Sequence, residues 1–267
     1  MYSAFITMET EICETLYRFF RTSSEYIEGY HSDAPYPESF AICNASVDSG
    51  AETAAAFGHS EYTDTDSNPA MPFRSMQDIY AAVAQCTACG LGLTRTKSVA
   101  GEGPEELSRL TNSVEVMVIG EGPGADEDRQ GRPFVGRAGQ LLDKMLEAIQ
   151  LSRKTNCYIT NVVKCRPPNN RDPAPEERSC CSAFLEAQIR LTQPKMILVM
   201  GRIAAQHLLQ TSDGIGKLRG RFFEYQGIPL MPTYHPSALL RDENLKRPAW
   251  EDLKQFRARL QELRSQG

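Results

Sequence analysis

The sequence contains no hydrophobic run that approaches the roughly 18 consecutive apolar residues of a membrane-spanning helix. Its N-terminal stretch begins without the basic n-region of a secretory signal and becomes acidic early. Hydrophobic residues make up 41% and charged residues 24% of the 267-residue chain, which is ordinary for a globular protein. We therefore expect a cytoplasmic protein with no membrane partner.

Basic residues are scarce in the first 70 positions, which hold 12 acidic and two basic residues, a net charge of -10. The rest of the chain holds 27 basic and 22 acidic residues, a net charge of +5. A mildly basic body is compatible with nucleic-acid binding or with ordinary surface charge. Residues 30–75 are rich in Ala, Ser, Gly, Pro and acids, which predicts a flexible, acidic N-terminal extension over 1–75 and a folded domain over 76–267. A short amphipathic helix is predicted within the extension, at 9–21.

Without a secretory context, the eight cysteines favour metal or redox chemistry over a disulfide framework. Cys86 and Cys89 form a C-x-x-C pair, which alone is compatible with a redox pair, half of a zinc site or no site. Cys165 and Cys181 add two thiols separated by 15 residues. Four thiolates can hold either zinc or an iron–sulfur cluster, and the residue types alone do not choose between them.

Short apolar runs alternate with helical patterns from about residue 75 onward. The runs at 114–120, 157–163, 195–201 and 228–234 predict buried strands. Helical patterns occupy 137–151, 174–192, 202–210 and 248–265. This alternation predicts an α/β fold, a three-layer α/β/α sandwich with a central, mostly parallel four-stranded sheet. Ligands of such sheets bind at the carboxyl ends of the strands, where the unusual motifs of this chain also fall.

The glycine-rich stretch GEGPG at 120–124 lacks the lysine of a phosphate-binding P-loop. It formally matches a dinucleotide fingerprint, but the fingerprint needs a helix to begin at once, and Pro123, Gly131 and Pro133 predict no helix before about Gly136. The carboxylates in the loop would also repel a phosphate. The loop is better suited to a flat, uncharged ligand, because glycine allows close approach to the backbone.

Three further side chains fall near the same predicted edge. Phe134 offers an aromatic face, although a core position is its ordinary alternative. Asn161 offers a donor and an acceptor side by side, as needed to read the edge of a base, or it closes a loop. His235 precedes Pro236, which restrains its backbone, and Ser237 is a candidate helix cap. Only the convergence of these segments favours a binding site over structural roles.

Four motifs in order, GEGPGADED, GRPFVGRAGQLL, NVVKCRPPNNRDP and HPSALLR, accompany the four cysteines. In these features the stretch 76–265 resembles the family 4, iron–sulfur uracil-DNA glycosylases. The resemblance implies a monofunctional DNA-repair enzyme that flips uracil out of DNA and hydrolyses its N-glycosidic bond. It implies a 4Fe–4S cluster on Cys86, Cys89, Cys165 and Cys181, with the neighbouring Cys180 rejected on spacing. Uracil-containing DNA, single- or double-stranded, is the implied partner, and we expect a monomer.

The resemblance also implies roles for single residues. Uracil would be bound by the backbone of three loop residues and by three side chains: Gly120, Glu121, Gly122, Phe134, Asn161 and His235. Catalysis would fall to Glu121, Glu127, Asn161 and His235. Related enzymes place an aspartate where this chain has Gly122, so Glu121 and Glu127 are the candidates to handle water, and Glu127 could instead exclude the methyl group of thymine. A wedge at Leu239 or Leu240 and a phosphate contact at Arg241 complete the set, with Leu239 equally suited to the core.

Two alternatives stay open at this point. A sister branch of the superfamily forms a covalent adduct with DNA, but the basic, His-containing insertion of that branch is missing after Lys164. A non-catalytic iron–sulfur or zinc DNA-binding module would keep the basic surface and the cysteines. It would not require Phe134, Asn161 and His235 together.

Overall fold

A computed structural model of the chain describes residues 73–104 and 114–266. Residues 1–72, including the helix predicted at 9–21, lie outside the described part, so the N-terminal extension remains a prediction. No helix in the described part is both long enough and apolar enough to cross a bilayer.

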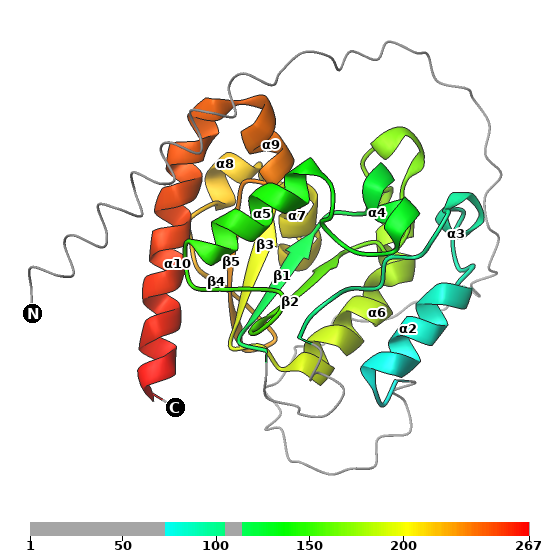
Figure 1. The fold of residues 1–267 in the computed structure, drawn as a ribbon, viewed down its shortest axis with the longest axis horizontal. Coiled ribbons are helices and arrows are strands. Elements are labelled where there is room, and N and C mark those ends of the chain that lie inside the picture. Colours follow the sequence, from blue (N-terminus) through cyan, green and yellow to red (C-terminus); the bar gives the residue numbers. More distant parts are fainter. Residues whose placement is uncertain (1–72, 105–113, 267) are drawn as a thin grey trace, which may run out of the picture. The chain divides into compact units, whose positions relative to one another are not determined.

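A central sheet is built from the four predicted strands and one more (Figure 1). Its strand order is β2-β1-β3-β5-β4, and the first four strands run parallel. They span Val116–Gly120 (β1), Cys157–Asn161 (β2), Met196–Met200 (β3) and Ile228–Thr233 (β5). The α/β class is therefore confirmed, and each predicted strand is present, one or two residues shorter than its apolar run.

The strand count is corrected from four to five by β4, Phe223–Tyr225, which pairs antiparallel with β5. It was missed because three residues are too few for a periodicity. The sequence signal is the turn that follows. Gln226 and Gly227 both have positive φ, 51° and 78°, as a two-residue hairpin turn requires.

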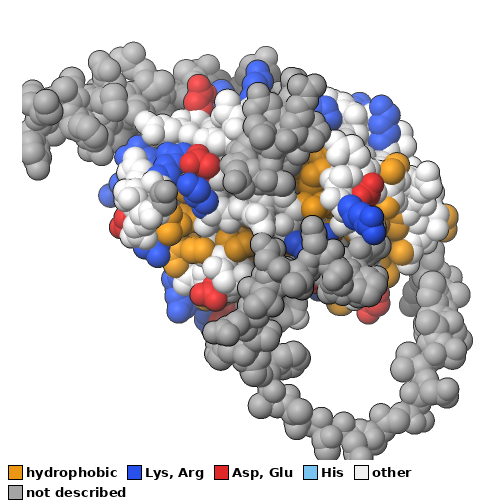
Figure 2. All heavy atoms as spheres, turned by 90° about the horizontal axis from the view of Figure 1, so that it is seen from below, with side chains coloured by type: hydrophobic (Ala, Val, Ile, Leu, Met, Phe, Trp, Pro, Cys, Tyr) orange, Lys and Arg blue, Asp and Glu red, His pale blue; other side chains and the backbone are white. Residues whose placement is uncertain are grey.

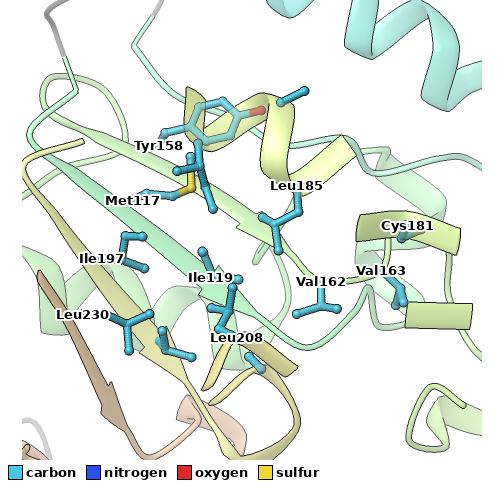
Figure 3. Close-up of a cluster of buried hydrophobic side chains, with 14 of the residues drawn as sticks. Met117, Ile119, Tyr158, Val162, Val163, Cys181, Leu185, Ile197, Leu208 and Leu230 are labelled. Carbon is cyan, nitrogen blue, oxygen red and sulfur yellow. The ribbon is translucent and has the colours of Figure 1, made fainter. Parts of the chain in front are cut away.

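Helices cover both faces of the sheet (Figure 1). On one side, buried side chains of α2, α6 and α7 join strand residues such as Met117, Ile119 and Ile197 in one cluster (Figure 3). Because strand side chains alternate, the neighbouring positions Val116 and Val118 face the other side, where α5 and α10 lie. These helices are α2 Met76–Gln85, α5 Arg137–Glu147, α6 Pro175–Thr192, α7 Arg202–Leu209 and α10 Lys246–Gln266.

Shorter helices connect these elements: α3 Leu91–Thr94, α4 Ala125–Gln130, α8 Ile215–Leu218, α9 Pro236–Arg241, and the 3-10 turns η3 Pro168–Asn170 and η4 Glu243–Leu245. Helix α4 contradicts the expectation that none begins before Gly136. Its start is stabilised by Glu127, whose Oε2 accepts the Gly124 N–H at 3.1 Å, and by three acidic residues in the first turn. It ends at Gly131 in the left-handed conformation, φ 77°.

Of the two outer strands of the sheet, β2 has a neighbouring segment and β4 is short. Glu102 exchanges two backbone hydrogen bonds with Ile159 of β2, at 2.9 and 2.7 Å, in an antiparallel bridge. The Val99 N–H donates to the Lys164 carbonyl at 2.8 Å, so the segment before Glu102 runs alongside the end of β2. At the opposite edge, β4 has only three residues.

Candidate active site

The carboxyl ends of the parallel strands bring distant parts of the sequence together. Gly120, the last residue of β1, is in register with Asn161, the last residue of β2. The Gly201 N–H donates to the Thr233 carbonyl at 2.9 Å, which joins the end of β3 to the end of β5 two residues before His235. The predicted site residues are therefore assembled at one edge of the sheet, as expected for this fold class.

Gly120 is the point on which two of the predicted side chains converge. A Cβ at this position would lie 2.4 Å from Asn161 Oδ1 and 2.5 Å from Phe134 Cζ. The Phe134 and His235 ring centroids are 5.6 Å apart, with 31° between the planes. The structure thus brings Gly120, Phe134, Asn161 and His235 together, and a Cβ at Gly120 would force the Asn161 amide or the Phe134 ring to shift.

Asn161 presents an unsatisfied polar atom. The residue is 1% exposed, and its side-chain Oδ1 has no hydrogen-bond partner. A buried acceptor without a donor costs about 1–3 kcal/mol, so such groups are rare and need a reason. An incoming ligand with an N–H group would satisfy this oxygen.

Lys164 binds the backbone carbonyl of Asn161. The sequence did not predict this role. Lys164 is 1% exposed, and its Nζ donates to Asn161 O at 2.6 Å, Thr160 Oγ1 at 2.8 Å and Gln188 Oε1 at 2.7 Å. Burial lowers the pKa of the ammonium group to about 7. Three oxygens match the three N–H donors of an ammonium group. A lysine directly after Val162 and Val163 is the only hint that the sequence offers.

The orientation of the His235 ring is fixed by Ser237. Its Nδ1 accepts the Ser237 N–H at 3.2 Å and lies 2.8 Å from Ser237 Oγ. Burial, assisted by the charge of Arg241, lowers the pKa of the imidazole to about 4. The ring is therefore neutral near pH 7, with its proton on Nε2. The helix cap of α9 is His235 itself and not Ser237, because the imidazole nitrogen accepts the backbone N–H.

The two carboxylates predicted to handle water have different surroundings. Burial, followed by the charge of Asp172, raises the pKa of Glu121 to about 7. Glu127 instead accepts three backbone N–H groups, from Gly124 at 3.1 Å, Val135 at 2.8 Å and Gly136 at 2.9 Å. Glu127 is thus committed to the backbone of its loop, which favours a positioning role over a catalytic one.

The remaining loop and wedge residues are placed as follows. Gly122 packs against Val163, whose Cγ2 would lie 2.7 Å from a Cβ. Leu239 is 1% exposed, which agrees with the core position that was one of its two expected roles. Leu240 is half-buried and Arg241 is exposed, both on α9 beside His235.

The four cysteines predicted as cluster ligands come from three segments and line one pocket with Cys180, Arg95 and Lys164. Cys165 and Cys181 are buried and belong to the hydrophobic core cluster, where Figure 3 shows Cys181 beside Val163. Arg95 Nη1 donates to Cys165 Sγ at 3.0 Å. In the described residues, no three His, Cys, Asp or Glu side chains are close enough to hold a single metal ion. The cysteines therefore surround a space instead of converging on one point.

Charged side chains of both signs are interspersed on the face of the molecule shown in Figure 2, with hydrophobic side chains between them. Basic residues near the site include Arg178, Arg202 and Arg241, each of which lowers the pKa of Glu121 against the larger effect of burial. Positive charge is thus present at the edge of the sheet where the ligand is expected.

Comparison with known proteins identifies the family. Residues 108–254, more than half of the chain, match the model of the uracil DNA glycosylase superfamily. A type-4 uracil-DNA glycosylase of Thermotoga maritima is 42% identical over 187 residues, covering 68% of this chain and 93% of the relative. Those of Sulfurisphaera tokodaii and Archaeoglobus fulgidus are 40% and 39% identical, covering 68% of this chain and 84% and 92% of the relatives.

The chain belongs to the type-4 uracil-DNA glycosylases. The predicted family is thereby confirmed, and the fold of a glycosylase of this superfamily accounts for the observed sheet. The roles of individual residues in this glycosylase remain predictions.

We predict that His235 titrates near pH 4 and carries its proton on Nε2 at neutral pH. Nitrogen-15 NMR of the histidine-labelled protein measures both quantities, and the His235→Gln variant identifies the signal among the four histidines. An exposed histidine would titrate near its ordinary pKa of about 6.5. Titration of His235 near that value, or a proton on Nδ1, would contradict the assigned geometry.

Proposed function

We propose that the Gly120 edge of the sheet binds a uracil base flipped out of DNA and positions it for hydrolysis of its N-glycosidic bond. The chain is a uracil-DNA glycosylase that acts in DNA repair, releasing uracil and leaving an abasic site. The observation that carries the assignment of the site is the buried Asn161 Oδ1, which lacks a donor and lies beside Gly120 and the Phe134 ring.

Asn161 is suited to select uracil over cytosine. Uracil presents N3–H as a donor and O4 as an acceptor, so one carboxamide can satisfy both groups through Oδ1 and Nδ2. Cytosine presents the opposite pair and would leave buried groups unsatisfied, at about 1–3 kcal/mol for each group. Phe134 supports the base by stacking, and the Gly120 backbone approaches it closely because no Cβ intervenes.

Cleavage breaks the bond between C1′ of the sugar and N1 of uracil, leaving the bonding electrons on the base. The uracil anion then accepts a hydrogen bond at O2 from the neutral His235 Nε2–H, and its charge is stabilised by preorganised donors. Water adds to the positively charged C1′, and its proton passes to the Glu121 carboxylate. Glu121 then releases this proton to solvent and the uracil anion takes one up, so the products are free uracil and an abasic sugar.

The target base must leave the DNA stack before it reaches this site, which costs a few kcal/mol. Leu240, half-buried on α9, is the remaining candidate to fill the gap now that Leu239 is in the core. Arg241, exposed on the same helix, is proposed to contact a phosphate. DNA contact at α9 would couple base flipping to His235, which caps the same helix.

We further propose that Cys86, Cys89, Cys165 and Cys181 hold a 4Fe–4S cluster. Support comes from the shared pocket that these cysteines line and from the Arg95 guanidinium, which would offset the negative charge of thiolate ligands. A single zinc ion needs all ligands about 2.3 Å from one point, whereas a cluster needs thiols around a wider space. A bound cluster would supply a structural cross-link between the segment after α2, the segment after β2 and helix α6.

The decisive test of the proposed function is uracil release from a DNA oligonucleotide with one deoxyuridine, beside matched thymine and cytosine substrates. We expect uracil release alone, and we expect Asn161→Ala to lower it by about 100-fold or more while DNA binding persists, because two base contacts are lost. Gln255→Ala, an exposed amide on α10, is the matched control and should retain activity. Iron-loaded, DNA-binding protein that releases no uracil would overturn the proposal.

Glu121 should impose a pH dependence on the reaction. Because burial raises its pKa to about 7, the carboxylate form grows as pH rises, and kcat/KM should increase about tenfold from pH 6 to pH 8. Glu121→Gln should be slower and lack this rise, whereas Glu186→Gln, exposed on α6, should keep it. An unchanged profile in Glu121→Gln would exclude this residue as the group responsible.

Cys181 and Cys180 are adjacent and differ in burial, which makes them a matched pair for the ligand assignment. Cys181→Ser should lose bound iron, the visible absorbance of the cluster and thermal stability, because the buried thiol faces the core. Cys180→Ser, at an exposed position, should retain all three. Iron loss from the Cys180 variant alone would reverse the assignment.

A further inference from the structure

The backbone that carries Phe134 adopts an unusual conformation. Phe134 has φ 51°, in the left-handed region that side chains other than glycine rarely occupy. Its carbonyl is directed at Gly139 on α5, where a Cβ would lie 1.9 Å from the Phe134 oxygen. A conformation of this kind persists only when the surrounding contacts enforce it.

Arg153 holds the carbonyl side of this loop. Its Nη1 donates to Pro133 O and its Nη2 to Phe134 O, both at 2.8 Å. The guanidinium is fixed in turn by Asp143 Oδ1, at 2.9 Å from Nε and 2.7 Å from Nη2, and by Glu102 Oε2 at 3.3 Å. Arg153 is 8% exposed, so these bonds are shielded from water.

Glu127 holds the amide side of the same loop. Its Oε1 accepts the N–H groups of Val135 and Gly136, the two residues that follow Phe134. In the stretch 133–136, the Arg153 cation therefore binds the carbonyls of the first two residues, and the Glu127 anion binds the amides of the last two. Neither charged side chain comes from the loop itself.

We propose that Arg153 and Glu127 are positioning residues that enforce the backbone of Phe134 and so set the plane of its ring beside Gly120. The proposal rests on the proposed function, in which this ring stacks on uracil. Without the two charged groups, Phe134 would relax to an ordinary φ, and its ring would leave the Gly120 and His235 contacts. In the intact protein, Arg153 therefore controls the stacking of Phe134 on the base without contacting the base itself.

The sequence could not show this role, because Arg153 lies between α5 and β2, outside every motif quoted above. The hydrogen bonds of Arg153 distinguish it from an arginine that only stabilises the fold. Two of its donors serve the carbonyl of Phe134 and that of the preceding residue, and the remaining contacts orient the guanidinium. A lysine would keep the charge but lose the planar fork that reaches both carbonyls.

The test is a double-mutant cycle on uracil release, with free uracil as a competitive inhibitor in parallel. We expect Arg153→Met to lower kcat/KM by about 30-fold and to weaken uracil inhibition, with Arg153→Lys in between. In a Phe134→Ala background, Arg153→Met should change kcat/KM by no more than about twofold, because the ring that it positions is absent. Additive effects in the cycle would overturn the proposal.

Arg132→Met is the matched control. Arg132 also pairs with Glu102, at 2.6 Å, but its side chain is 57% exposed. It should retain wild-type kinetics. Should Arg153→Met fail to fold, Glu127→Leu supplies the second variant, since it removes the oxygen that accepts the Val135 and Gly136 N–H groups, and it should show the same non-additivity with Phe134→Ala. Wild-type protein without uracil release would refute the proposed function, whereas active wild type with an unaffected Arg153→Met would refute only the positioning role of Arg153.

Discussion

The absence of a side chain at Gly120 is the constraint on which the site depends. The Asn161 amide and the Phe134 ring both occupy space that a single methyl group would fill. This arrangement follows from the parallel register that ends β1 and β2 side by side. The strands therefore determine which backbone atoms a base can approach, and the side chains around them determine which base is accepted.

Chemically similar side chains at this edge differ in their surroundings and therefore in the roles proposed for them. Glu121 and Glu127 are six residues apart, yet one has its pKa raised to about 7 and the other accepts three backbone N–H groups. His235 is neutral because desolvation of its ring disfavours the charged form and because its Nδ1 accepts a backbone N–H. Of the acidic residues of the glycine loop, Glu121 is thus suited to catalysis and Glu127 to holding the loop backbone. The sequence alone does not separate these two roles.

The fold and much of the site were predictable because they depend on local patterns. Apolar runs located four strands, and the order of strands and helices placed the ligand at the carboxyl edge, where Gly120, Asn161 and His235 are found. Helix α4 was missed because its cap comes from Glu127 and not from a residue before the helix. Strand β4 was too short, and the burial of Leu239 depends on the packing of α9. Contacts between segments far apart in sequence, such as Arg153 with Phe134, have no local signal.

The two edges of the sheet are poorly suited to pairing with a strand of another molecule, which bears on aggregation. Exposed strand edges recruit other chains and begin aggregation. One outer strand, β2, has its free groups partly used by the bridge between Glu102 and Ile159, and the other, β4, offers only three residues. A second molecule therefore finds little unpaired backbone on which to extend the sheet. The same bridge ties Glu102, a partner of Arg153, to the sheet, so one residue covers the strand edge with its backbone and supports the Phe134 loop with its side chain.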